Sequence, residues 1–197
     1  MGDALLASQP RTGYSEDPQR KIHERSIFMT AIRHGIILVG HGGIPSDYPK
    51  ELVTKLKRLE AAREASGGPM SQEELELDRK IRTWPRTPET DPYQAGLELL
   101  ASHMRPLLNG AKFAIAYNEF CGPTLPQAVE TLVAQGVTKI TVVSTMFTPG
   151  GSHSEFEIPA TLDQLRAQYP AVTFTYAWPF DLAQVAKMLM EHVRRFD

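Results

Sequence analysis

Four short apolar runs alternate with segments of helical pattern along this chain of 197 residues, and this alternation restricts the fold more than any other feature. The first run, GIILVG at 35–40, is apolar at consecutive positions, which is typical of a parallel strand covered on both faces. The other expected strands lie within 111–120, 139–147 and 172–180. Strands that alternate with helices predict an α/β fold, a doubly wound parallel β-sheet flanked by helices on both faces in three layers.

The chain divides into three parts by composition. Residues 1–33 are polar with little apolar periodicity, and we expect them to form a flexible N-terminal leader. Residues 34–197 are expected to form one α/β domain. Within it, 50–92 is interpreted as a helical and proline-rich insertion, because a capping box from Ser71 to Glu74 precedes a proline-rich connection. The other expected helices lie within 49–68, 93–108, 124–136, 158–169 and 182–196.

Composition argues against several classes of function. The formal charge of −2 provides no basic field for nucleic acid or for an anionic membrane surface. No apolar run approaches the roughly 20 residues that span a bilayer, and the N-terminus lacks the apolar core of a signal peptide. The single cysteine, Cys121, excludes an internal disulfide framework and a thiolate zinc cluster. We therefore expect a cytoplasmic protein without nucleic-acid or membrane partners.

Chemically informative side chains follow three of the four expected strands. In parallel α/β sheets ligands bind beyond the carboxyl ends of the strands, so these side chains are expected to meet at one edge. They are His41 with Gly42 and Gly43 after the first strand, Glu119 after the second, and Gly150, Gly151, Ser152 and His153 after the third. Two imidazoles and a carboxylate suit a first-row divalent metal, and glycines beside both histidines allow the close approach of a bulky ligand.

Each of these residues also has an ordinary structural interpretation. His41 can be a hydrogen-bonded histidine, His153 a surface loop histidine, and Glu119 a carboxylate near a helix N-terminus. Their joint placement after three strands favours a shared site over three separate coincidences.

Nucleotide-binding and esterase motifs are missing from the sequence. The segment GHGGIPSDYPK at 40–50 has neither the Gly-Lys-Ser/Thr of a P-loop nor the later glycine of G-x-G-x-x-G, and no G-x-S-x-G is present. The segment TPGGSHSE at 148–155 can instead hold an anion through its backbone amides, and the carboxylates of a tetrapyrrole are suitable anions.

Three blocks of the sequence resemble a known family. They are LVGHGG at 38–43, AYNEFCGPTLPQAV at 116–129, and TKITVVSTMFTPGGSHSEFEIPATLDQLRAQYP at 138–170. The third is the most specific, because its glycine-rich loop leads into His153 and then Glu157-Ile158-Pro159. In these blocks the chain resembles the CbiX-type class II chelatases, the sirohydrochlorin cobaltochelatases and ferrochelatases. The resemblance covers about 34–48 and 93–185, and leaves out the leader and 50–92.

The resemblance implies a reaction and a set of site residues. Members of this family insert Co²⁺, Fe²⁺ or Ni²⁺ into a sirohydrochlorin-type tetrapyrrole without ATP. The family's metal-binding histidines map to His41 and His153, and its active-site glutamate maps to Glu119. The single GHG motif and the single GGSHS loop indicate one chelatase lobe, for which the family implies a homodimer. Glu157 stands where the family more usually has aspartate.

Two other functions remain open at this point. A non-catalytic metal or tetrapyrrole carrier would use the same cleft and bind its ligand without turnover. A degenerate lobe that serves as an interaction module, with 50–92 as its contact surface, is less favoured because His41, Glu119 and His153 are all present.

Overall fold

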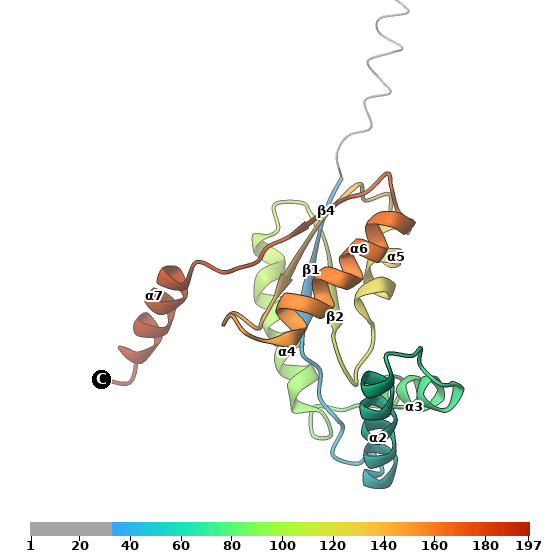
Figure 1. Cartoon of the computed structure of the whole chain (residues 1–197). Coiled ribbons are helices and arrows are strands. Elements are labelled where there is room, and N and C mark those ends of the chain that lie inside the picture. Colours follow the sequence, from blue (N-terminus) through green and yellow to red (C-terminus); the bar gives the residue numbers. More distant parts are fainter. Residues whose placement is uncertain (1–32) are drawn as a thin grey trace, which may run out of the picture. The chain divides into compact units, whose positions relative to one another are not determined.

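The computed structural model describes residues 33–197, which contain one four-stranded, all-parallel sheet (Figure 1). The strand order is β2-β1-β3-β4, and Ile37 in β1 pairs with Ala114 in β2 and Val142 in β3. The strands are β1 (His34–Gly40), β2 (Lys112–Tyr117), β3 (Lys139–Ser144) and β4 (Thr173–Tyr176). The expected leader, 1–33, lies outside the described residues except for its last position.

All four expected strands are present, but β2, β3 and β4 end earlier than the segments expected for them. After Tyr117 the backbone amide of Asn118 donates to Gly40 O at 2.9 Å, and that of Glu119 donates to His41 O at 2.7 Å. Phe120 then has a positive φ of 54°, which breaks the strand conformation. Glu119 therefore lies in a loop that is hydrogen-bonded to the loop after β1.

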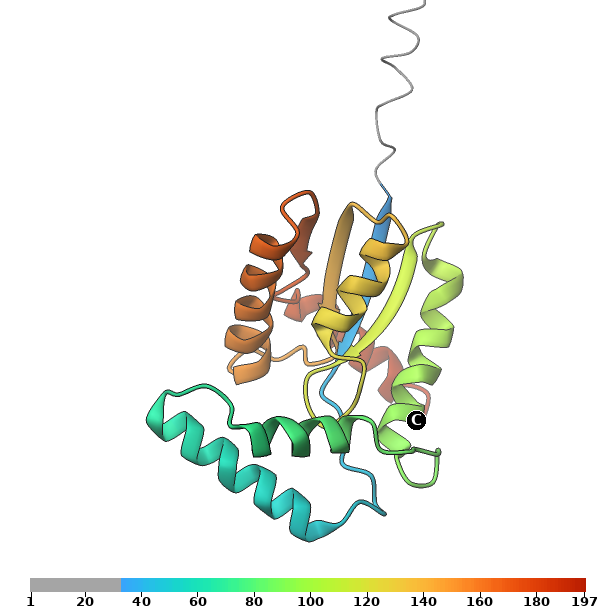
Figure 2. The ribbon, with the colours of Figure 1, turned by 90° about the vertical axis from the view of Figure 1, so that its right-hand side faces the viewer.

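Helices cover both faces of the sheet, as the alternating pattern predicted (Figure 2). Leu38 packs with α4 (Pro92–Met104) on one face. Ile37 and Val39 pack on the other face with α5 (Leu125–Ala134) and α6 (Ile158–Gln168). Successive side chains of a strand point to opposite faces, so the consecutive apolar residues of β1 serve both layers. Short turns at Arg105–Leu107 and His153–Glu157 follow α4 and precede α6, respectively.

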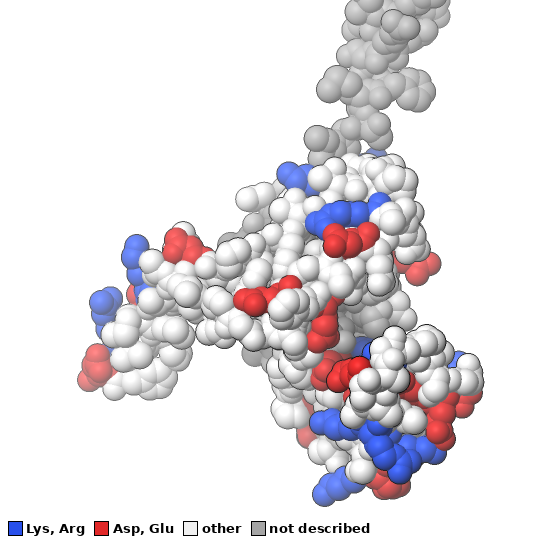
Figure 3. All heavy atoms as spheres, in the orientation of Figure 1, with Lys and Arg blue, Asp and Glu red and all other residues white. Residues whose placement is uncertain are grey.

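The segment between β1 and α4 forms a helical hairpin of α2 (Lys50–Ser66) and α3 (Gln72–Arg82). Half of the expected capping box begins α3: Ser71 Oγ accepts a hydrogen bond from the Glu74 amide at 3.1 Å, whereas the Glu74 carboxylate pairs with Arg63 at 2.8 Å instead of the Ser71 amide. The hairpin has its own apolar cluster, made of Tyr48, Leu56, Leu77, Ile81 and Phe120. Charged side chains gather over α2 and α3 (Figure 3), so this cluster lies beneath a charged surface.

The last helix, α7 (Leu182–Val193), has no buried residue. It follows the stretch 177–181 and lies beyond the α4 face of the sheet (Figure 1). Within 33–197 no helix combines the length and the apolar character required to cross a membrane.

Candidate metal centre

The expected site lies where the strand connections change direction. The chain leaves β1 toward β2 on one side, whereas β3 and β4 follow on the other side of β1. In such sheets a crevice forms at the carboxyl ends of the two strands that border this reversal, here β1 and β3. His41 follows β1 directly, and His153 begins the helical turn after β3. The two histidines are 112 positions apart in sequence and meet at this point.

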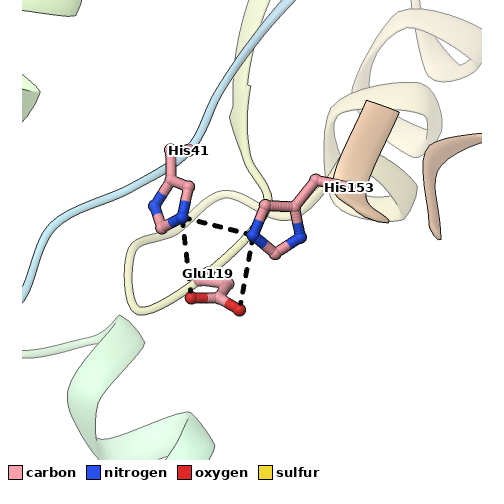
Figure 4. A group of neighbouring side chains, drawn as sticks. All are labelled: His41, Glu119 and His153. Carbon is pink, nitrogen blue, oxygen red and sulfur yellow. Dashed lines mark hydrogen bonds and ion pairs between the residues drawn. The ribbon is translucent and has the colours of Figure 1, made fainter. Parts of the chain in front are cut away.

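The structure brings His41, Glu119 and His153 together (Figure 4). The Nε2 atoms of the two imidazoles are 3.2 Å apart. Glu119 Oε2 lies 3.9 Å from His41 Nε2, and Glu119 Oε1 lies 3.7 Å from His153 Nε2. Ligand atoms about 2.1 Å from an ion are about 3.0–3.4 Å apart in octahedral or tetrahedral geometry. The group fits a divalent ion after a small movement of the carboxylate, and it is the one such group found in residues 33–197.

Hydrogen bonds orient both imidazoles with Nε2 toward the shared point. His41 Nδ1 lies 2.9 Å from Gly42 O, and His153 Nδ1 lies 2.8 Å from Glu157 Oε1. Gly42 O and Glu157 Oε1 are acceptors, so they favour the tautomer with hydrogen on Nδ1 and leave a lone pair on each Nε2. Asn118 Nδ2 also lies 2.8 Å from His153 Nδ1, and in this tautomer the Asn118 amide donates to Glu157 Oε2 instead. The two Nε2 atoms are 3.2 Å apart, so their lone pairs repel each other. A cation bound between the two nitrogens would attract both lone pairs.

Glu157 is held as an anion behind His153. Its Oε2 accepts a hydrogen bond from Asn118 Nδ2 at 2.9 Å. Burial raises the pKa of the Glu157 carboxyl, but hydrogen bonds from Asn118 and His153 outweigh burial and hold the pKa below its usual value. The carboxylate can therefore accept the His153 Nδ1 hydrogen and increase the basicity of Nε2.

Sequence reasoning did not assign this orienting role to Glu157, and it did not identify Asn118 or Tyr93. The spacing of four residues between His153 and Glu157 was a usable signal, since it places both on one helix face. The Tyr93 hydroxyl accepts a hydrogen bond from the His41 amide at 2.7 Å. No local pattern marks that contact, because 52 positions separate the two residues.

The predicted ligand-facing glycines divide into two kinds. Gly42 has a φ of +98°, and a Cβ there would lie 1.9 Å from Glu119 O. A Cβ added at Gly43 would lie 3.2 Å from Asp91 Oδ1. These two glycines serve contacts between loops rather than an open ligand surface, which corrects the expectation from sequence. Gly150 meets nothing within 4 Å of its added Cβ, and Gly151 and Ser152 are exposed, so this loop remains accessible.

The loop before His153 also differs from the expected anion site. The Gly150 amide donates to Glu155 Oε1 at 2.8 Å, so a side chain of the same loop already occupies it. An anionic group would have to displace that carboxylate to use the amide.

We expect Gly42→Ala to weaken Co²⁺ binding by at least about tenfold, because the new Cβ forces the Glu119 backbone to move. Isothermal titration with Co²⁺ measures the effect. Gly110→Ala is the matched control, since Gly110 has a φ of +84° and open space around it. Equal Co²⁺ affinities in the two variants would contradict the importance of this contact.

Cys121 and Phe120 have structural roles. The Cys121 side chain is fully buried, and burial raises the pKa of its thiol to about 11, so it remains protonated at neutral pH. This is the usual role of a small buried thiol. Phe120 follows β2 directly, but it is 8% exposed and packs under α2 and α3. Its positive φ turns the side chain away from the strand end and into the hairpin cluster.

The parallel α/β sheet thus carries, at its reversal point, a cluster of two histidines and one carboxylate whose atoms are close enough to hold a metal ion. The family model for CbiX matches residues 89–195, more than half of the chain. The protein therefore belongs to the CbiX family, as the sequence resemblance indicated. The matched range includes Glu119 and His153, whereas His41 lies outside it.

Sequence similarity to a curated relative covers only part of either chain. A sirohydrochlorin cobaltochelatase from Priestia megaterium is 34% identical over 73 residues, which are 37% of this chain and 24% of that protein. This chain thus matches about a quarter of that relative's length.

Two solved structures are similar to this chain at low identity and low TM-score. The sirohydrochlorin chelatase SirB from Bacillus subtilis subspecies spizizenii, solved in complex with cobalt, has 19% identity and a TM-score of 0.43 over 75% of this chain and 43% of that one. A cobalamin (vitamin B12) biosynthesis CbiX protein from Marinobacter aquaeolei VT8 has 21% identity and a TM-score of 0.44 over 82% of this chain and 98% of that one. The fold assignment rests on the sheet described above and not on these values.

Proposed function

We propose that this protein inserts a divalent metal, Co²⁺, Fe²⁺ or Ni²⁺, into a sirohydrochlorin-type tetrapyrrole without using ATP. The observation that carries the proposal is the group of His41, Glu119 and His153 at the sheet's reversal point in a CbiX family member. Imidazole and carboxylate ligands suit all three metals, so the donor set does not select one of them. A cytoplasmic location remains a prediction from the single cysteine.

The proposed reaction exchanges one metal ion for two pyrrole N–H protons. The Nε2 atoms of His41 and His153 hold the ion while its water ligands leave. Glu119 contributes negative charge to the ion or accepts a pyrrole proton, which requires a carboxylate within hydrogen-bond reach. Two neutral nitrogens and one carboxylate leave coordination positions open for the macrocycle nitrogens, and an open site suits transfer better than a closed four-ligand site.

The side chains of the three candidate ligands are accessible to solvent. The His41 side chain is 41% exposed, and those of Glu119 and His153 are 35% and 18% exposed. Phe147 in the loop after β3 lies 5.9 Å from Phe180, centroid to centroid, in an edge-to-face arrangement. These two half-buried rings follow strands of the same sheet edge, and we propose that they contact the macrocycle face.

The direct test mixes the protein with sirohydrochlorin and each metal in turn, and follows the absorbance of the macrocycle. We expect many metallated macrocycles per protein chain, formed faster than without protein. A signal that stops at one macrocycle per chain, with no acceleration of metallation, favours the carrier function and contradicts the chelatase proposal.

We also propose that a second copy of the chain covers α7 and walls the cleft. Beside α7 lies an apolar groove that includes Leu38 and Val143 of the sheet and Phe147 of the loop before His153. Several large apolar side chains of α7 are about half exposed: Leu182, Met188, Leu189, Met190 and Val193. A contiguous apolar surface of this kind marks an interface, and its continuity with the β3 loop would bring the partner to the site.

The dimer proposal predicts a mass of twice the 22.0 kDa of one chain by light scattering after size exclusion. We expect Leu189→Asp to give a monomer, because a carboxylate replaces a half-exposed apolar side chain at the interface. Lys187→Asp, on the same helix, is the control and should remain dimeric. A monomeric wild-type protein at tens of micromolar would contradict the proposal.

A further inference from the structure

The Glu119 carboxylate depends on its loop for its position. In residues 33–197 its ion-pair partners are the two imidazoles, at 3.7 Å and 3.9 Å, and no other side chain or backbone group bonds it. The carboxylate is therefore placed by the backbone of 118–121. This loop contains a tight turn in which the Cys121 amide donates to Glu119 O across Phe120, whose φ is positive. Such a turn is strained and needs support from its surroundings.

Two arginines from the 50–92 segment supply that support. Arg82 Nη1 donates to Cys121 O at 3.0 Å, and Arg82 Nη2 donates to Asn118 O at 3.3 Å. Arg86 Nη2 donates to Phe120 O. Together with the Cys121 amide on Glu119 O, these bonds satisfy every carbonyl from 118 to 121.

Arg86 also connects this loop to the loop of His41. Its Nη1 donates to Gly43 O at 2.9 Å and pairs with Asp91. The Arg86 and Asp91 side chains are only 5% and 2% exposed, so water does not compete for these bonds. A guanidinium presents five donors in a rigid fork. One buried side chain can therefore hold both ligand-bearing loops at a fixed separation.

We propose that Arg82 and Arg86 are positioning residues for Glu119, and that the 50–92 segment thereby serves as the scaffold of the metal site. This inference rests on the proposed metal-binding role of His41, Glu119 and His153. It assigns a function to a segment that lies outside the resemblance to the family. Arg82 is the better residue to test, because its ion pair with Asp78 is partly exposed, with side chains 18% and 25% exposed. Arg86 instead belongs to a buried ion pair whose loss threatens the fold.

The test is a double-mutant cycle on Co²⁺ affinity, measured by isothermal titration without the macrocycle. We expect Arg82→Met to weaken Co²⁺ binding by about 10–100-fold, the usual effect of losing a group that orients a ligand. In a Glu119→Gln background the same change should have little further effect, since the ligand it positions is already altered. A merely structural role of Arg82 would weaken binding equally in both backgrounds.

Two more variants keep the result interpretable. Arg79→Met on the same helix is the matched control, because Arg79 is exposed and lacks a side-chain hydrogen bond or ion pair within 33–197; its Co²⁺ affinity should equal that of wild type. Arg82→Lys preserves the charge but loses the guanidinium that donates to two carbonyls, and should bind Co²⁺ with intermediate affinity. If circular dichroism shows that Arg82→Met is unfolded, Arg82→Lys replaces it in the double-mutant cycle.

The outcomes separate this inference from the proposed function. Wild-type affinity in folded Arg82→Met, or equal losses in both backgrounds, would overturn the positioning role. Co²⁺ binding without metallation of sirohydrochlorin would overturn only the chelatase proposal. A wild-type protein that binds no Co²⁺ would overturn both.

Discussion

His153→Ala should reduce metal insertion by about a hundredfold or more while the protein remains folded. The change removes one of two imidazole ligands, and even the loss of an outer hydrogen-bond partner costs about 10–100-fold in metal affinity. His153 lies near the surface, with 18% of its side chain exposed, so its loss should change the free energy of unfolding little. The measurement is the initial rate of macrocycle metallation with Co²⁺, together with a denaturant unfolding curve.

The matched control for this variant is His103→Ala. His103 is an exposed histidine on α4, away from the three candidate ligands. It should keep the wild-type metallation rate. A folded His153→Ala protein with a wild-type rate would rule out His153 as a metal ligand.

Asp91→Ala should lower the free energy of unfolding by ~3–5 kcal/mol, the usual cost of leaving one partner of a buried ion pair uncompensated. Asp91 is 2% exposed and pairs with the buried Arg86 guanidinium. Its Oδ1 also accepts a hydrogen bond from the Gln94 amide at 2.9 Å and so caps α4. Urea unfolding monitored by circular dichroism measures the change.

The surface pair of Asp163 and Arg166 provides the comparison. These side chains are 76% and 45% exposed, so solvent screens their attraction and Asp163→Ala should cost less than ~1 kcal/mol. Similar decreases in the free energy of unfolding in Asp91→Ala and Asp163→Ala would contradict the claim that burial makes the Asp91–Arg86 pair important for stability.

The sequence predicted the parts of the fold that depend on local pattern. Consecutive apolar residues such as Ile37 and Leu38 indicated a strand covered on both faces, and the two residues indeed pack against different helix layers. The α/β class, the parallel sheet and the family were confirmed. The ends of β2 and β3 were wrong by three residues and the end of β4 by four, because hydrogen bonds to distant carbonyls, and not apolar character, determine where pairing stops.

The meeting of His41, Glu119 and His153 was also predictable, because parallel strands bring their carboxyl ends to one edge. The groups that orient them were not. Arg82 and Arg86 belong to a proline-rich segment without a motif, and their partners lie 34 to 43 positions away. Phe120 follows β2 directly, yet its positive φ turns the side chain into the hairpin cluster and buries it. Such contacts follow from tertiary packing and leave no trace in local sequence.

The most direct test of the account is the position of the metal in a crystal of the protein with Co²⁺. Anomalous scattering at the cobalt edge should show one ion within about 2.0–2.2 Å of His41 Nε2, His153 Nε2 and a carboxylate oxygen of Glu119. An ion bound elsewhere, or imidazoles that still face each other with no ion between them at saturating Co²⁺, would contradict the claim that these three residues form the metal site.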